Sequence, residues 1–185
     1  APLLTSPDAL PVPPPRLPPR SPTLRTAAHH GKKAAMHCVA VEIHTALAPT
    51  HLWSAVIDVD RHSNCSESIV LADVVEQAGP EHRMTAWRMQ WGDASLQWTQ
   101  TEQIDTRASR LYFHRIGGDL RCFTGHWAVR PAGIGGSLLT LYAEFQIGDS
   151  SLAERLSPTL ASGLWDNAHL MVASLQPRLL SSALH

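Results

Sequence analysis

The chain has 185 residues, of which 44% are hydrophobic and 17% are charged, and its formal net charge is −1. This length suits one large domain, or one domain with an appended tail, and the apolar content is that of a globular protein. The near-neutral charge argues against nucleic acid as a partner, and no apolar run approaches the roughly 20 residues of a membrane span.

The first 35 residues differ in composition from all that follows. Nine of the 14 prolines lie between residues 2 and 22, where they remove backbone donors and favour extended polyproline conformations. We predict a Pro-rich linker or tail over 1–35 and a folded domain over 36–185. A proline-rich motif for a partner protein and a transit peptide are the alternatives.

The three cysteines, Cys38, Cys65 and Cys122, have neither paired spacing nor histidines at metal-binding spacing. Reduced thiols and a cytoplasmic location are therefore expected. No sequence motif indicates a metal or another cofactor, so we expect none.

The folded part begins with a predicted strand over 37–45, where apolar and polar residues alternate. Ala48-Pro49-Thr50 then opens a helix that runs to about residue 60. Six further strands follow, divided by turns rich in Gly and Pro, over 69–77, 82–91, 94–105, 110–116, 121–130 and 136–147. Short turns between successive strands indicate an antiparallel meander.

A long helix is predicted at the C-terminal end of the domain. Ser157-Pro158 is a typical helix start, and a short helical piece over 151–156 is expected before it. An apolar stripe at helical spacing then extends to Leu175, and Pro177 ends or kinks the helix. A curved sheet wrapped around this helix would leave a cavity of the kind that binds small molecules.

The strand over 94–105 carries the first candidate site residues. Trp98 shares a strand face with Gln100 and Glu102, so an amide and a carboxyl are expected in an otherwise apolar wall. Both are candidate catalytic residues, since such groups serve general acid and base chemistry. The alternative is that Glu102 lies at the sheet rim and pairs with an arginine such as Arg115.

Several aromatic and apolar side chains are expected to contact a substrate, and so is the amide of Asn167, for which a backbone partner is the alternative. Alternation places each of them toward the predicted helix, or on that helix itself, and plain core packing is the alternative. These candidates are Trp87, Met89, Trp91, Trp98, Phe123, Trp127, Asn167 and Met171.

The stretch from Ile116 to Trp127 predicts a turn on Gly117-Gly118 and then a bent strand with a glycine inside it. His126 is a third catalytic candidate, since its imidazole titrates near neutral pH. Strand alternation places His126 on the face of the sheet opposite to that of Trp127, unless a bulge shifts the register.

Short motifs along the folded part are similar to those of a known superfamily. They are Ala48-Pro49 with Leu52-Trp53, Trp98, Ser109-Arg110 with His114-Arg115, Gly118-Asp119-Leu120, Gly125-His126-Trp127, Gly135-Gly136, Glu144-Phe145 and Asn167. In order and spacing, over about 37–180, they resemble the START-like superfamily, in particular the bacterial polyketide aromatase/cyclases.

The resemblance implies an α+β helix-grip fold, in which a curved antiparallel sheet of about seven strands wraps around a long C-terminal helix and encloses a cavity. It implies a cofactor-independent polyketide cyclase/dehydratase (aromatase), a lyase of antibiotic biosynthesis. Such an enzyme folds a carrier-bound poly-β-ketone and promotes aldol ring closure and dehydration. An acyl carrier protein is the implied partner, and a homodimer is an open alternative.

Two other functions stay open, a non-catalytic carrier of a quinone, lipid or other hydrophobic small molecule, and an interaction domain of a multidomain synthase. The chain also departs from the family pattern. Aromatase/cyclases often place an arginine a few residues past the tryptophan of the fourth strand, where this chain has Glu102 or Gln103. A cation in the cavity must therefore come from elsewhere.

Overall fold

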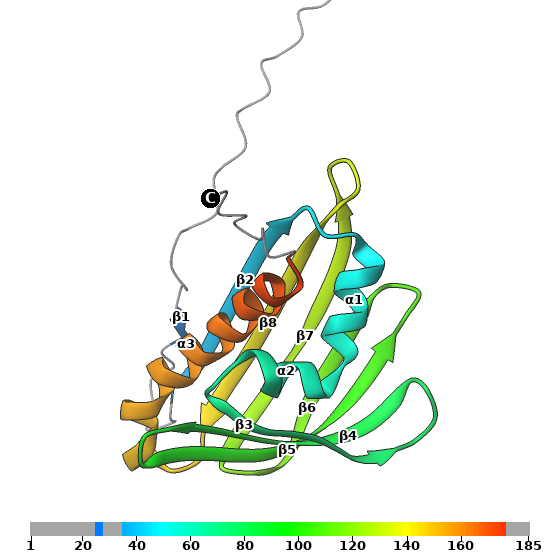
Figure 1. The fold of residues 1–185 in the computed structure, drawn as a ribbon. Coiled ribbons are helices and arrows are strands. Elements are labelled where there is room, and N and C mark those ends of the chain that lie inside the picture. Colours follow the sequence, from blue (N-terminus) through cyan, green and yellow to red (C-terminus); the bar gives the residue numbers. More distant parts are fainter. Residues whose placement is uncertain (1–24, 28–34, 177–185) are drawn as a thin grey trace, which may run out of the picture.

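One antiparallel sheet forms the framework of the domain (Figure 1). The computed structural model describes residues 25–27 and 35–176. The eight strands of the sheet follow the order β1-β2-β8-β7-β6-β5-β4-β3. They are β1 Arg25–Ala27, β2 Met36–Thr45, β3 Ile69–Gln77, β4 His82–Trp91, β5 Ala94–Asp105, β6 Arg110–Gly118, β7 Leu120–Ala132 and β8 Gly136–Ile147.

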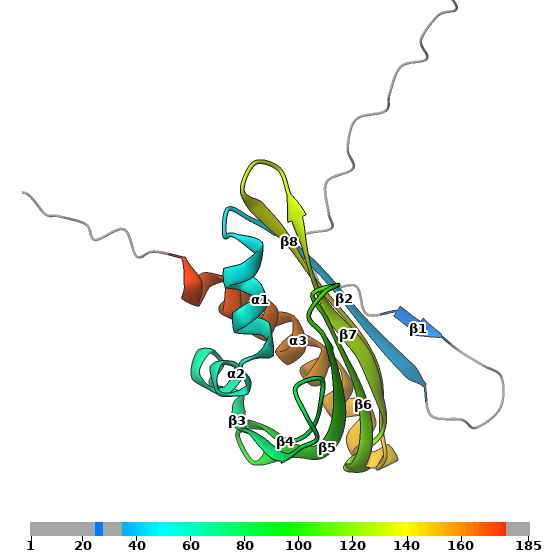
Figure 2. The ribbon, with the colours of Figure 1, turned by 90° about the vertical axis from the view of Figure 1, so that its right-hand side faces the viewer.

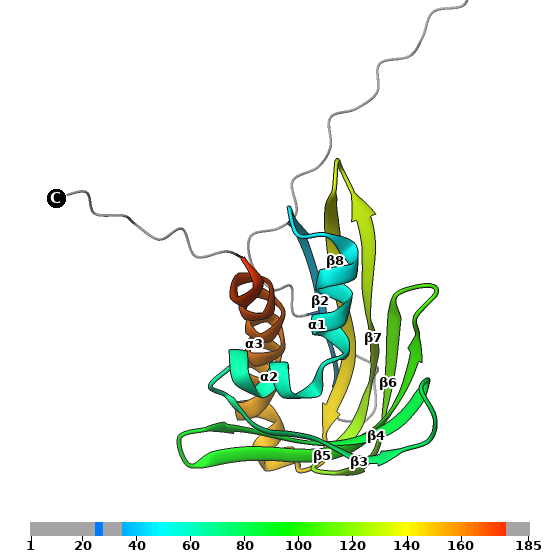
Figure 3. The ribbon, with the colours of Figure 1, turned by 45° about the vertical axis from the view of Figure 1, so that its right-hand side comes forward.

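Three helices, α1 Pro49–Ile57, α2 Val59–Cys65 and α3 Ser150–Leu175, lie on one side of the sheet (Figure 2). Strands β3, β4 and β5 curl beneath them, while β2, β8 and β7 run upright beside α3 (Figure 3). The apolar core fills the space between this concave face and the helices. No helix in the described part of the chain is both long and apolar enough to cross a membrane.

The predicted fold, an antiparallel sheet curved around a long C-terminal helix, is confirmed. β3 to β8 form the predicted meander, and β2 joins it by pairing with β8. The short strand β1 lies within the segment expected to be a tail, and Arg25 pairs with Cys38 of β2. Residues 1–24 and 28–34 of that segment, and Pro177, lie outside the described residues.

Two helix predictions were wrong in detail. The helix expected to run to about residue 60 is interrupted at Asp58, whose extended backbone (φ −82°, ψ 103°) separates α1 from α2. Ser157-Pro158 does not start the last helix, because α3 is continuous and contains Pro158. Its N-cap is Asp149, whose carboxylate accepts a hydrogen bond from the Ser151 backbone N–H at 2.8 Å.

The helix continues through Pro158 because its apolar face continues on both sides of the proline. Leu156 and Leu160 are both buried, while Pro158 is exposed. The proline ring and the carbonyl of Glu154, which loses its N–H partner, therefore lie on the solvent side of the helix. Burial of the opposite face outweighs the local helix-breaking tendency of proline.

Close backbone packing at Gly125 accompanies the bend of the sheet. A Cβ atom at Gly125 would collide with the backbone of Tyr142 and would lie 2.7 Å from the Phe113 ring. Only glycine fits where β7 approaches these neighbours so closely. Packing is also close at Gly163 on α3, where a Cβ would lie 2.7 Å from the end of the flexible Met89 side chain, which would have to shift.

Replacing Gly125 with alanine should lower the free energy of unfolding by about 2 kcal/mol, because the added methyl group overpacks the interior. The matched control is Gly117→Ala, where a Cβ would meet no atom within 4 Å. Urea denaturation of both variants measures the difference. Equal stabilities of the two variants would contradict this account of the bend.

Candidate functional site

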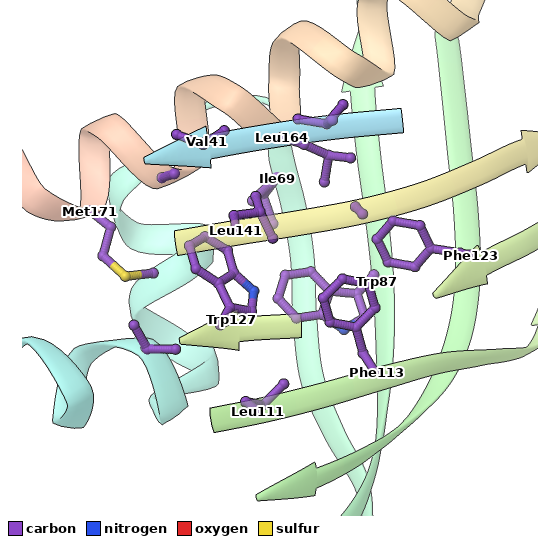
Figure 4. Packing of buried hydrophobic residues seen from close by; sticks show 14 of the residues in the cluster. Val41, Ile69, Trp87, Leu111, Phe113, Phe123, Trp127, Leu141, Leu164 and Met171 are labelled. Atoms are coloured by element: carbon purple, nitrogen blue, oxygen red, sulfur yellow. The ribbon is translucent and has the colours of Figure 1, made fainter. Parts of the chain in front are cut away.

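A narrow cavity lies between the concave face of the sheet and α3. Its volume is only about 30 Å³, which leaves room for little more than a water molecule. Its wall is mostly aromatic and aliphatic, and Figure 4 shows Trp87, Phe113, Phe123 and Trp127 gathered in this part of the core. Any larger ligand must displace some of these side chains.

The structure brings most of the predicted side chains to the wall of this cavity. They come from β4, β5, β7 and α3, and they are Trp87, Met89, Trp98, Gln100, Phe123, Trp127 and Asn167. Their contact with a substrate stays a prediction. The wall also contains side chains that the sequence did not single out, namely His62, Ile69, Phe113, Leu141 and Leu164.

Two predicted contact residues lie elsewhere in the core. Trp91 is half-buried and packs close to the backbone of Gly163, at the end of β4. Met171 is fully buried and belongs to the core around α3, but it is not on the cavity wall. Strand and helix periodicity identified the buried face correctly but could not tell core positions from cavity positions.

His126 points to the opposite side of the sheet. Its ring lies between those of Tyr112 and Tyr142, at centroid distances of 6.0 Å and 5.9 Å. Partial burial, and then the charge of Arg110, lower the pKa of His126 from its ordinary value. No bulge occurs in the pairing of β7 around this residue, so strand parity holds and His126 cannot reach the cavity.

A network of hydrogen bonds beside the cavity converges on Glu102, whose side chain is 2% exposed. The Trp98 indole N–H donates to Gln100 Oε1 at 2.8 Å, and Gln100 Nε2 donates to Glu102 Oε1 at 2.7 Å. The Trp87 N–H donates to the Thr85 hydroxyl at 2.8 Å, and that hydroxyl donates to the same carboxylate oxygen at 2.9 Å. Glu102 itself therefore lies behind Gln100 and is not on the cavity wall.

Arg83 supplies the counter-charge of this carboxylate. Its Nε lies 2.6 Å from Glu102 Oε2, and its Nη1 donates to the Ile57 carbonyl at 2.8 Å. Arg83 and Glu102 face each other directly across β4 and β5. The alternative prediction that Glu102 pairs with an arginine is therefore confirmed. Its details were wrong, because Glu102 is buried and is not at the sheet rim, and because Arg115, the arginine named as an example, sits opposite Gln100.

Arg83 was not predicted as the partner of Glu102, but strand alternation in the sequence could have identified it. It has the same parity as Thr85, Trp87 and Met89 in β4, all of which face inward. Arg83 does not supply the expected cavity cation, because it is paired with Glu102 and is not on the cavity wall.

His62 is the polar wall residue that sequence reasoning missed. Its Nε2 lies 3.0 Å from the Val56 carbonyl, and its Nδ1 lies 3.0 Å from Asn167 Nδ2. A carbonyl can only accept, so Nε2 carries the proton and Nδ1 accepts from the amide of Asn167. The Cys65 thiol contacts the other atom of that amide, Oδ1, at 3.7 Å.

The His62 ring is also fixed by aromatic contacts. It meets Trp87 and Trp127 edge-on, at centroid distances of 5.3 Å and 5.6 Å. Complete burial lowers the pKa of His62, and the Val56 carbonyl and the Glu102 charge oppose this less strongly. The imidazole is therefore neutral near pH 7, and both of its nitrogens already have partners.

A family model described as "Polyketide cyclase / dehydrase and lipid transport" matches residues 36–175. The chain belongs to this family. A search of curated protein sequences finds no match.

Solved structures with the same fold include the Zhui aromatase/cyclase from Streptomyces sp. R1128, with 12% identity and a TM-score of 0.68 over 75% of this chain and 93% of that one. A START superfamily protein from Mycobacterium smegmatis has 12% identity and a TM-score of 0.61, over 75% and 99% of the two chains. The human StarD13 (DLC2) lipid transfer and protein localization domain has 16% identity and a TM-score of 0.61, over 85% and 91%. At these identities the likeness shows the fold alone.

The buried neutral His62 should make the domain less stable in mild acid. Its pKa is lower in the folded than in the unfolded chain, so the unfolded chain takes up the proton first. The free energy of unfolding should therefore fall as the pH drops below about 6.5, the pKa of an unfolded histidine. Urea denaturation at several pH values measures this dependence.

The variant His62→Gln, which keeps a donor and an acceptor, should weaken the pH dependence. His114→Gln, on an exposed position of β6, is the matched control and should retain it. A wild-type dependence in His62→Gln would show that another group is responsible.

Proposed function

We propose that the domain binds a flat, carbonyl-rich hydrophobic molecule of the polyketide type and promotes its aldol ring closure and dehydration. The observation that carries this proposal is the pairing of an aromatic cavity wall with two oriented side-chain amides, Gln100 and Asn167. Each amide nitrogen gives one N–H to a fixed partner, Glu102 or His62, and has a second N–H for a ligand carbonyl.

The chemistry asks little of the protein beyond orientation. In ring closure a methylene carbon loses a proton and bonds to a carbonyl carbon, whose oxygen takes up a proton. In dehydration the resulting hydroxyl leaves as water with a neighbouring C–H proton. A methylene between two carbonyls is already acidic, so a cavity that folds the chain, excludes water and donates hydrogen bonds to the carbonyl oxygens accelerates both steps.

Family membership and the aromatase/cyclase among the neighbours support this proposal. We further propose that the substrate is delivered on an acyl carrier protein. Because the cavity admits little more than water in its present form, the aromatic side chains must shift to admit the substrate.

Addition of the protein to a minimal polyketide synthase should redirect a mixture of shunt products to one regiospecifically cyclised aromatic product. Gln100→Leu should reduce this yield at least tenfold. It removes the hydrogen bond to the ligand, worth about 1.4 kcal/mol, and also the bonds of Gln100 to Trp98 and Glu102. Gln103→Leu, on the exposed face of β5, is the control and should behave as wild type. Liquid chromatography of the products measures these yields. An unchanged shunt mixture with the wild-type protein would refute the cyclase function.

A non-catalytic carrier of a quinone or lipid is the second candidate. One observation favours it, because the polar groups on the cavity wall are bonded to other protein groups, and both nitrogens of His62 are occupied. A carrier needs no group that moves protons. Native mass spectrometry of freshly purified protein distinguishes a carrier from a cyclase, because a carrier should retain a lipid or quinone in stoichiometric amount.

A further inference from the structure

We infer that Glu102 is a positioning residue, which orients the indole rings of Trp87 and Trp98 as one wall of the cavity, and that it does not exchange a proton with the ligand. The inference concerns the same cavity as the proposed function. The inference does not require a polyketide ligand, because it applies to any planar molecule in the cavity. An experiment that contradicts it can therefore be distinguished from one that contradicts the cyclase function.

Both indole N–H groups reach the same oxygen of Glu102, each through one intermediate residue. Trp87 reaches it through Thr85, and Trp98 reaches it through Gln100. In each case the intermediate lies two residues along the same strand, on the same face. The two tryptophans are themselves direct cross-strand neighbours.

The direction of every bond in this network is determined by chemistry. An indole N–H and a guanidinium can only donate, and an ionised carboxylate can only accept. Gln100 must therefore turn its oxygen to Trp98 and its nitrogen to Glu102, and the Thr85 hydroxyl must donate to the carboxylate. Among the side chains described in this network, Glu102 is the only one that purely accepts, so the orientations of the others depend on it.

The rings are held in one orientation as a result. Their planes differ by only 8° and their centroids are 6.3 Å apart, so the two rings are stacked nearly parallel to each other. Rotation of either ring would leave a buried N–H without a partner, which is unfavourable. The edge of His62 also contacts Trp87, which restricts this ring from the helix side.

Arg83 holds the carboxylate in place and keeps it away from the cavity. Its side chain is 9% exposed, and it bonds both to Glu102 Oε2 and to the Ile57 carbonyl at the end of α1. Both oxygens of Glu102 thus have donors, and Gln100 stands between Glu102 and the cavity. A group placed in this way can orient its neighbours but cannot reach a ligand atom.

The variant Thr85→Val tests the inference without touching Glu102. Valine matches threonine in shape but breaks the link between Trp87 and the carboxylate. We expect a changed near-ultraviolet circular dichroism spectrum, in which the tryptophans dominate, and about tenfold weaker binding of anilinonaphthalene sulfonate, a planar fluorescent probe. Thr99→Val, on the opposite face of β5, is the control. A wild-type spectrum and affinity in Thr85→Val would overturn the inference.

The double variant Arg83→Gln/Glu102→Gln separates positioning from proton transfer. It replaces the ion pair with a neutral amide pair, so that no buried charge is left unpaired, and the oxygen of the amide introduced in place of the carboxylate can still accept from Thr85 and Gln100. A positioning role predicts a wild-type spectrum, with probe binding and turnover within about fivefold of wild type. A loss of turnover of roughly 100-fold or more with an unchanged spectrum, the effect of removing a general acid or base, would overturn the inference.

The single variant Glu102→Leu should show a changed near-ultraviolet spectrum and weaker probe binding. It leaves Arg83 buried and unpaired, and it leaves Thr85 and Gln100, which link the two tryptophans to Glu102, without their acceptor. A wild-type spectrum and affinity in Glu102→Leu would also overturn the inference. If the protein proves inactive on polyketides, the spectrum and the probe binding still decide the role of Glu102.

Discussion

The ion pair between Glu102 and Arg83 is the interaction on which the polar interior of this domain depends. A lone carboxylate at this depth would be strongly destabilising, and the guanidinium beside it makes its burial tolerable. Once present, the carboxylate determines the orientation of the amide of Gln100 and of two indole rings. Through the Ile57 carbonyl, Arg83 also joins the curled strands β4 and β5 to the end of α1.

The shape of the cavity follows from close packing elsewhere. Gly125 lets β7 lie against the backbone of Tyr142, and Gly163 lets α3 approach β4 at Met89. The sheet therefore bends tightly around the helix and leaves only a narrow space lined by aromatic rings. A planar molecule suits such a space better than a bulky one, since it can lie against the rings with little displacement of side chains.

His62 and Asn167 form a second polar cluster, which joins α2 to α3. The break at Asp58 turns the chain so that α2 places this imidazole against Trp87 and Trp127. In both polar clusters most hydrogen-bonding groups already have partners within the protein. Their amides can therefore donate to a ligand from a fixed position, whereas their acidic and basic groups are held by other residues. This arrangement supports the proposal that the domain holds its ligand in one conformation.

The sequence by itself determined seven of the eight strands of the described sheet and the antiparallel meander of six of them. It also determined the faces that Trp87, Trp98, Phe123 and Trp127 present to the interior, because the period of two along a strand is a local property. It also placed Gln100 and Glu102 on the inner face. Only the tertiary structure decided which arginine meets Glu102, that His62 reaches the cavity, and that the last helix continues past Pro158. Each of these depends on strand register, on the break at Asp58 or on burial against a distant element, which join residues far apart along the chain.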